Sequence, residues 1–325
     1  MRLIVADIGG TNARFAVSVQ GEPSLRHITN FRCADFVGFE DAFERFLTGL
    51  PRDEQSSHHL LSLAVAGPVN DQIIDVSNNH WRFDKNRLLE RLALDKLLVI
   101  NDFTAQALAQ HEVANGDRSK ILDGVEDASA PLLVIGPGTG LGVSALIPVA
   151  QGPLPVEGEG GNIRFAPQTE PERDLCAFME QHTDHVVVEH FVSGPGLENI
   201  HRFLAGSAGS EPSLSAEMIA TSALHDEGIC RDAVNLMTGI LGAVIRDHVL
   251  TMGCWRGAVI TGGIMPRLQS LIVSSPLERR FRSGGEMSHI LRNVPVWLST
   301  DPHAGLKGAQ AAFGNPYLAH RMVTG

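Results

Sequence analysis

The chain has 325 residues, 43% of them apolar and 19% charged, which is enough apolar material for more than one folded core. Its net charge of −11 disfavours nucleic acid and anionic membrane surfaces as partners, because like charges repel. The cysteines are too few and too scattered for a disulfide framework or a zinc site. We find neither a signal-peptide core nor an apolar stretch suited to spanning a bilayer, so the sequence predicts a soluble cytoplasmic protein.

The first third of the chain alternates strand and helix patterns. Apolar runs over 3–6 and 15–19 flank the turn DIGGTNAR and predict a strand–turn–strand hairpin. Aromatic residues at helical spacing predict a helix over about 36–49. Three further patterns predict a strand over 60–69, a helix over 85–93 and a strand over 97–100. This alternation is typical of an α/β protein.

The remainder continues in the same way. A second glycine-rich hairpin is predicted over 131–149, followed by a loop rich in Gly, Pro and Glu over 152–162. Later patterns predict a helix near 170–182, a mixed apolar segment over 186–204, a long core helix over 231–251 and a strand over 258–266. Residues 3–17 and 132–146 share the plan of strand, glycine turn and strand, which predicts a duplicated architecture.

The two glycine turns are candidate phosphate-binding loops. Glycine leaves the backbone N–H groups uncovered, and threonine adds a hydroxyl donor. The residues concerned are Gly9, Gly10 and Thr11 in the first loop and Gly136, Gly138, Thr139 and Gly140 in the second. Neither loop fits the P-loop or the dinucleotide-binding pattern. Asp7 beside the first loop is a candidate Mg²⁺ ligand, directly or through water, and capping of the turn is the alternative role.

Carboxylates and amides later in the chain are suited to a sugar acceptor. Asp102 ends a buried strand and is the candidate base for a hydroxyl proton, with Asn101 beside it. The alternative is that this pair caps the following helix. Glu159 lies in the glycine-rich stretch GEGGN, and Glu189 follows the apolar run VVV. A glutamate of this kind taken alone is more often a solvated surface residue.

Taken in order, these motifs resemble those of the bacterial glucokinases, in the hexokinase, heat-shock-ATPase and actin superfamily. The resemblance runs from about residue 3 to about 313 and rests on DIGGTNARFAV, AVAGPV, NNHW, INDFTA, GPGTGLGV, GEGG, EHFVSGPGLENI, ITGGIMPR and AGLKGAQAA. It implies an α/β, two-domain, actin-like ATPase (ribonuclease H-like) fold with its active site in an interdomain cleft. The implied small domain is 1–111 plus 302–325, and the large domain is 112–301.

The resemblance also implies the chemistry: transfer of a phosphoryl group from ATP, with Mg²⁺, to the 6-hydroxyl of glucose, in a cytoplasmic homodimer. Asp102 matches the catalytic base, and Asn101, Glu159 and Glu189 match the sugar ligands. ATP would lie across both loops, with Gly262 and Gly263 near the adenosine. Nucleotide binding is also expected of Ala6, Asp7, Ile8, Gly9, Gly10 and Thr11.

One position departs from the family pattern. After GEGG the family usually has His, whereas this chain has Asn162, so the hexose preference and the contacts at the anomeric end are open. Asn162 could bind the sugar through a water. The alternatives are a kinase for another hexose or an N-acetylhexosamine, a switch ATPase of the actin or chaperone kind, and polyphosphate as the donor. A sugar-responsive repressor is disfavoured, because we find no N-terminal helix-turn-helix pattern in this sequence.

Overall fold

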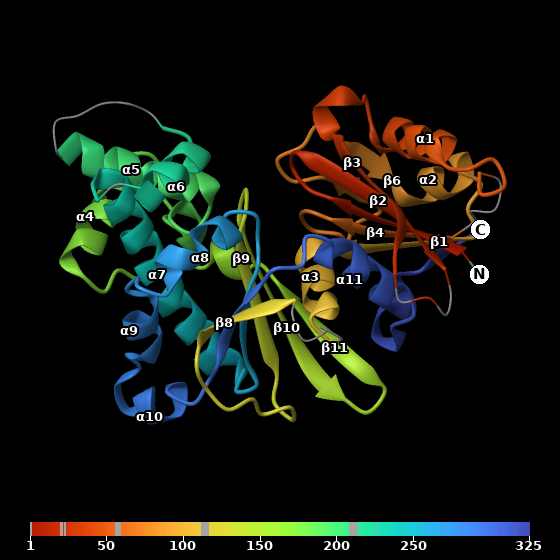
Figure 1. The fold of residues 1–325 in the computed structure, drawn as a ribbon. Coiled ribbons are helices and arrows are strands. Elements are labelled where there is room, and N and C mark those ends of the chain that lie inside the picture. Colours follow the sequence, from red (N-terminus) through yellow and green to blue (C-terminus); the bar gives the residue numbers. More distant parts are fainter. Residues whose placement is uncertain are drawn as a thin grey trace. The chain divides into compact units, whose positions relative to one another are not determined.

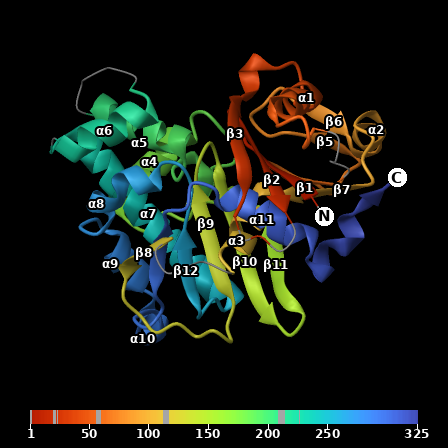
Figure 2. The same ribbon diagram turned by 45° about the vertical axis from the view of Figure 1, so that its right-hand side comes forward.

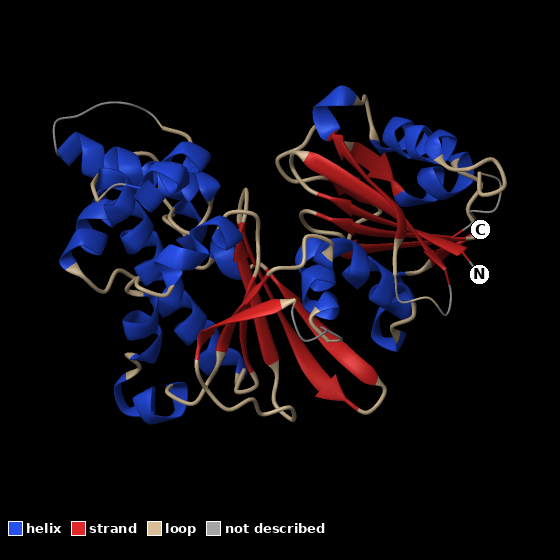
Figure 3. Ribbon diagram, in the orientation of Figure 1, coloured by secondary structure: helices blue, strands red, loops and turns tan. Residues whose placement is uncertain are grey.

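The computed structural model describes residues 2–19, 22, 24–55, 60–111, 117–207, 214–225 and 227–325. These residues form two compact units, each a mixture of helices and strands (Figure 3). Unit 1 comprises Met1–Ala114, Leu146–Glu157 and Asp301–Gly325, and unit 2 comprises Asn115–Ala145 and Gly158–Thr300.

Unit 1 is built on a six-stranded sheet in the order β14-β7-β4-β1-β2-β3. The strands are β1 (Arg2–Ile8), β2 (Asn12–Val19), β3 (Arg26–Arg32), β4 (Leu60–Val65), β7 (Lys96–Asn101) and β14 (Val323–Thr324). The β1–β2 hairpin is antiparallel, as predicted, whereas β1, β4 and β7 run parallel. A short pair, β5 (Ile73–Asp75) and β6 (Arg82–Asp84), forms a separate two-stranded sheet.

Helices cover both faces of the first sheet. Figures 1 and 2 show α1 (Phe39–Gly49) and α2 (Lys85–Arg91) on one face, and α3 (Asp102–Ala109) and α11 (Ala304–Phe313) on the other. The helix predicted over 36–49 begins at residue 39, because the backbone after the 3-10 turn Cys33–Asp35 is extended at Phe36 and at the N-cap Gly38. Beneath α1, Phe15 is fully buried and stacks on Phe46 with 5.3 Å between ring centroids. Aromatic packing therefore fixes α1 to the sheet.

The second sheet has the order β11-β10-β9-β12-β13-β8. Its strands are β8 (Arg118–Leu122), β9 (Leu132–Pro137), β10 (Leu141–Val149), β11 (Gly152–Gly158), β12 (Gly257–Ile260) and β13 (Val296–Ser299). Here β9, β12 and β13 run parallel, as β1, β4 and β7 do in the first sheet. The orders β3-β2-β1-β4-β7 and β11-β10-β9-β12-β13 therefore follow one plan, in agreement with the predicted duplication.

The helices of unit 2 are α4 (Glu170–Met179), α5 (Gly194–Ser207), α6 (Ala216–His225), α7 (Ile229–Met252), α8 (Gln269–Ile272), α9 (Leu277–Arg282) and α10 (Ser288–Leu291). By length and composition α7 is apolar enough to cross a membrane, so the expectation that no stretch qualifies is wrong. However, 72% of its most apolar window is buried, and α7 packs against α5, α6 and α9. Its apolar residues are therefore those of a core helix.

Two other predictions are corrected. Residues 152–162, expected to be a loop, contain the strand β11, which is possible because β11 is an edge strand and its prolines need no ladder partner on the open side. The segment Leu146–Glu157, assigned from the sequence to the large domain, belongs to unit 1. Side chains near the C-terminus hold it there: Asn315 Nδ2 donates to the Pro153 carbonyl over 2.8 Å, and Arg321 pairs with Glu157 over 2.6 Å.

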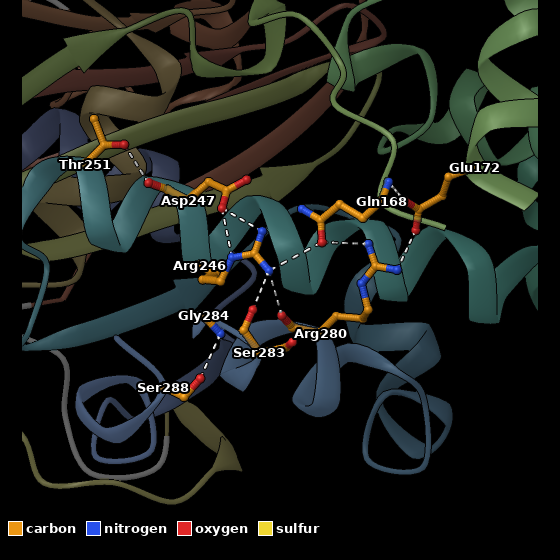
Figure 4. A network of polar contacts seen from close by, with 9 residues as sticks. All are labelled: Gln168, Glu172, Arg246, Asp247, Thr251, Arg280, Ser283, Gly284 and Ser288. Atoms are coloured by element: carbon orange, nitrogen blue, oxygen red, sulfur yellow. Dashed lines mark hydrogen bonds and ion pairs between the residues drawn. The ribbon is translucent and has the colours of Figure 1, made fainter. Parts of the chain in front are cut away.

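Buried charges join three segments of unit 2 (Figure 4). Glu172 of α4 pairs with Arg280 of α9 over 2.7 Å, and their side chains are 2% and 11% exposed. Gln168 donates its backbone N–H to Glu172 Oε2 and accepts from Arg280 and from Arg246 of α7. The network thus fixes Gln168, just before α4, to α7 and α9.

Helices α3 and α11 pack closely in unit 1 because α11 presents Gly308 to α3. A Cβ at Gly308 would overlap the carbonyl group of Ala105 in α3. We therefore expect Gly308→Ala to lower the free energy of unfolding by about 3 kcal/mol, near the top of the range for overpacking. Thermal or denaturant unfolding measures this loss. Gly314→Ala is the matched control, since a Cβ there meets nothing within 4 Å, and equal effects of the two substitutions would contradict the prediction.

Candidate active site

The first glycine loop joins β1 to β2 and is held from outside by two other segments. Gly9 N–H donates to the Asn12 carbonyl over 2.9 Å, and Cys33 N–H donates to the Thr11 carbonyl over 2.9 Å. Asn79 Nδ2 donates to the Gly9 carbonyl over 3.0 Å. Within the described residues, no hydrogen bond is donated by the N–H of Gly10 or Thr11. The loop therefore presents backbone donors to a ligand.

Ala6 and Ile8 were predicted to contact the nucleotide, and both side chains lie in the core of unit 1. At these two positions only main-chain atoms could therefore contact a ligand. Asp7 lies between them in β1, and its Oδ2 accepts from Arg14 Nη1 over 3.2 Å. Burial raises the pKa of Asp7, and the charge of Arg14 opposes that rise. Gly305 of α11 lies against the carboxylate, where a side chain would not fit.

Asn101 and Asp102 mark the passage from β7 to α3, and the structure shows Asn101 as the cap. Asn101 Oδ1 accepts from the N–H of Phe103 and Thr104 over 2.8 and 3.2 Å. Its amide nitrogen donates to the Gly67 carbonyl and to Asp102 Oδ1 over 3.2 and 3.1 Å. Asp102 Oδ1 also accepts the Phe103 N–H over 3.0 Å. Asn101 satisfies the helix end, and together these bonds orient the Asp102 carboxylate.

The first loop and Asp102 lie at the same edge of the unit 1 sheet. Ile8 is in register with Val65, and Val65 with Asn101, at the carboxyl ends of three adjacent parallel strands. Adjacent strands are about 4.8 Å apart, so the two strand ends are separated by roughly 10 Å. Ligands of open α/β sheets bind at this edge.

The second glycine loop joins β9 to β10 and is tied to Glu189. Leu141 N–H donates to Glu189 Oε2 over 2.7 Å, and Gly194 N–H donates to the Gly138 carbonyl over 2.8 Å. No hydrogen bond from the N–H of Thr139 or Gly140 occurs in the described part of the chain. Glu189, predicted as a sugar ligand, is thus also a support for this loop.

Glu159 and Asn162 lie in a 3-10 turn that packs on the same loop. Both side chains are exposed. The backbone of Gly161 lies against the Leu141 carbonyl, and Gly160 lies against His248 of α7. Burial lowers the pKa of His248, and the Gly160 backbone and the charge of Asp247 oppose that fall. Leu141 thus joins the turn, Glu189 and the second loop within unit 2.

The Gly262–Gly263 turn follows β12, beside the second loop. Ile135 of β9 is in register with Ile260 of β12, so the two turns leave the same edge of the second sheet. Gly262 has φ of +97°, and a Cβ there would overlap the Pro137 carbonyl, whereas Gly136 lies against Thr261. Only glycine allows this approach of two backbones. A Cβ at Gly263 would meet nothing within 4 Å.

The sequence reasoning missed several supporting residues. Arg14 could have been found, because a hairpin that turns at residues 9–11 places Asp7 opposite Arg14, as the register shows. Asn79 and Gly305 reach the first loop and Asp7 from distant segments, and no local pattern signals them. Glu157 accepts from Thr104 of α3 over 2.7 Å and pairs with Arg321, which also depends on the tertiary fold.

Comparisons with known proteins agree with this arrangement. The glucokinase family model matches residues 4–316. A glucokinase of Helicobacter pylori (strain P12) is 37% identical over 98% of this chain and 97% of its own length. One of Aromatoleum aromaticum is 36% identical over 96% of this chain and 94% of its own length.

Solved structures show the same fold. A glucokinase from an Antarctic psychrotroph has a TM-score of 0.82 at 32% identity, over 97% of this chain and 99% of that chain. A ROK family glucokinase from Streptomyces griseus, in complex with glucose and AMPPNP, has a TM-score of 0.65 at 22% identity, over 95% of this chain and 98% of that one. These likenesses confirm the predicted two-domain actin-like fold. Since the family model and the relatives align with nearly the whole chain, this protein belongs to the glucokinase family, as its motifs indicated.

Proposed function

We propose that this chain transfers the γ-phosphoryl group of ATP to the 6-hydroxyl of glucose, with Asp102 as the general base. The observation that carries the proposal is the shared sheet edge: the first glycine loop follows β1 and Asp102 follows β7, at the carboxyl ends of two parallel strands that lie on either side of β4. A base and a phosphate loop must be close together if a hydroxyl is to attack phosphorus in line. Family membership supports the same reaction and does not favour a switch ATPase.

Proton removal is the task of Asp102 in this mechanism. Its Oδ1 is held by the Asn101 amide and the Phe103 N–H, so the carboxylate keeps one orientation at the helix start. A fixed orientation matters because general-base catalysis requires the carboxylate within hydrogen-bond reach of the attacking hydroxyl. Asn101 holds Asp102 in place and contributes an amide beside it.

In this proposal the hexose is bound by five side chains: Asn101, Asp102, Glu159, Asn162 and Glu189. Carboxylate oxygens accept hydrogen bonds from sugar hydroxyls, and Asn162 can both donate and accept. Glu159 and Asn162 project from one exposed turn, and Glu189 is joined to that turn through Leu141. Closure around a bound hexose would exclude water and favour the sugar over hydrolysis of ATP.

The triphosphate is bound by the backbone donors of the two glycine loops, with Gly262 and Gly263 beside the adenosine. Asp7 fits as a magnesium ligand, because Mg²⁺ is usually bound through one or two carboxylates together with substrate phosphates. No group of three or more potential metal ligands occurs in the described residues, which agrees with a metal held mainly by the nucleotide. When bound, Mg²⁺ would neutralise phosphate charge. A cytoplasmic homodimer remains part of the proposal.

A coupled assay of ADP release across a panel of hexoses tests the proposal. We expect ADP release to require both Mg²⁺ and a hexose, with glucose giving the highest kcat/KM, and phosphate to appear at the 6-position by NMR. Mannose and N-acetylglucosamine serve as the competing acceptors, and polyphosphate as the competing donor. ADP release that is independent of sugar would contradict the proposal, and preference for another acceptor would assign a different substrate.

A further inference from the structure

A pocket of about 440 Å³ lies against the first glycine loop, entirely within unit 1. Gly10 and Thr11 form one side of it. Arg32, the last residue of β3, forms a second side, and the turn that carries Asn78 and His80 forms a third. The pocket is therefore continuous with the loop whose free backbone donors are described above.

The three sides are joined by hydrogen bonds that make the pocket a built feature. Asn79 donates to the Gly9 carbonyl and accepts the Trp81 N–H over 3.2 Å, which ties the turn to the loop. Cys33 N–H donates to the Thr11 carbonyl, which ties the end of β3 to the same loop. Gly10 lies so close to Asn78 that a Cβ would be 3.1 Å from the Asn78 carbonyl oxygen.

The charge of the pocket is unusual for this protein. The chain carries a net charge of −11, yet no acidic residue lines the pocket, whereas Arg32 does. Within the described residues the exposed side chain of Arg32 makes no hydrogen bond and no ion pair. By contrast, Arg26 at the other end of β3 pairs with Glu22 over 2.6 Å. An uncompensated guanidinium beside backbone N–H donors is a binding arrangement for phosphate oxygens.

We propose that Arg32 is an additional phosphate-binding residue, and that this pocket receives a terminal phosphate group beside Gly10 and Thr11. The ligand chemistry is a terminal phosphoryl group, carried as an anhydride by the nucleotide or as an ester by the phosphorylated sugar. This inference rests on the proposed function, because that reaction involves both compounds. The guanidinium adds charge-assisted hydrogen bonds to a site that otherwise holds phosphate through neutral amides and a hydroxyl.

Kinetics of Arg32→Gln test the inference, with Arg26→Gln on the same strand as the matched control. We expect Arg32→Gln to raise the KM for ATP or the inhibition constant for glucose 6-phosphate about tenfold, the size of a lost charge-assisted hydrogen bond. The KM for glucose should stay unchanged. Arg32→Lys should restore part of the affinity, since it keeps the charge without the fork of donors. Unfolding temperatures of all variants verify that they are folded.

Direct calorimetric binding of ADP, of glucose 6-phosphate and of inorganic phosphate separates the two sources. Weaker binding of ADP alone in Arg32→Gln assigns the pocket to the nucleotide, and weaker binding of glucose 6-phosphate alone assigns it to the product. Unchanged binding of every phosphate compound overturns the inference. A parent protein that binds ADP through Arg32 but does not phosphorylate glucose would refute the proposed function and leave the phosphate site standing.

Discussion

Asp102→Asn is expected to lower kcat by about 100-fold to 10,000-fold, the contribution of a well-placed general base. The amide oxygen can still accept from Phe103 N–H and from the Asn101 amide, so the fold and the start of α3 should be preserved. What is lost is the group that takes the hydroxyl proton. Steady-state kinetics should therefore show a large fall in kcat with the glucose KM changed only a few-fold.

Asp84→Asn provides a matched control for that experiment. Asp84 is the N-cap of α2 in the same unit, where its Oδ1 accepts from the N–H of Asn86 and Arg87 over 2.9 and 3.0 Å. Asparagine caps helices about as well as aspartate, so this variant should keep both its stability and its activity. If Asp102→Asn turned over within a few-fold of the parent, Asp102 would only support the start of α3 and would not be the base.

Glu172→Met is expected to cost about 3–5 kcal/mol of unfolding free energy, the largest loss that we predict for a single side chain. The substitution leaves the guanidinium of Arg280 buried without its carboxylate, and it removes the acceptor of the Gln168 N–H (Figure 4). A buried charge without a partner is far more costly than a lost surface pair. Denaturant unfolding followed by circular dichroism gives the value.

The double variant Glu172→Met with Arg280→Met separates an unpaired charge from lost packing. Replacing both partners of a buried pair by apolar residues is often neutral, so the double variant should recover most of the loss. Glu217→Gln is the surface control, because Glu217 pairs with Arg267 where both side chains are more than half exposed, at 71% and 57%. It should change stability by less than about 1 kcal/mol. A double variant less stable than Glu172→Met would show that the charge is not the cause.

Local patterns were sufficient to predict most elements near the site. Apolar periodicity predicts three of these elements: the β1–β2 hairpin, the strand ending at Asn101 and the long helix α7. Their buried residues recur at the period of the strand or helix itself, so the pattern is visible in the local sequence. Patterns failed where burial depends on a distant partner. Residues 152–158 read as a loop from their glycines and prolines, yet they form the edge strand β11 beside β10. The start of α1 also shifted, because Phe36 fits the helical period but has extended backbone, and the helix begins only after the N-cap Gly38.

The site residues divide in the same way. Asp7, the two glycine loops and the Asn101–Asp102 pair could be singled out because their types and spacing suit phosphate and hydroxyl chemistry. The residues that hold these groups in place could not be predicted in this way. Asn79 reaches Gly9 across 70 residues, and Leu141 is bonded by Glu189 across 48 residues. Such contacts have no period in the sequence, and only the packed chain brings them about.

The sequence alone predicted which groups could bind a phosphate and a sugar, and on which strand ends they lie, because local conformation follows from side-chain type and order. The tertiary structure decided how those groups are held. It made Asn101 the helix cap that orients Asp102, paired buried Asp7 with Arg14 and, among the described residues, left the Arg32 side chain without a hydrogen bond or an ion pair. The physical reason is that orientation, burial and charge compensation are set by neighbours in space, and these neighbours come from segments far apart in the chain.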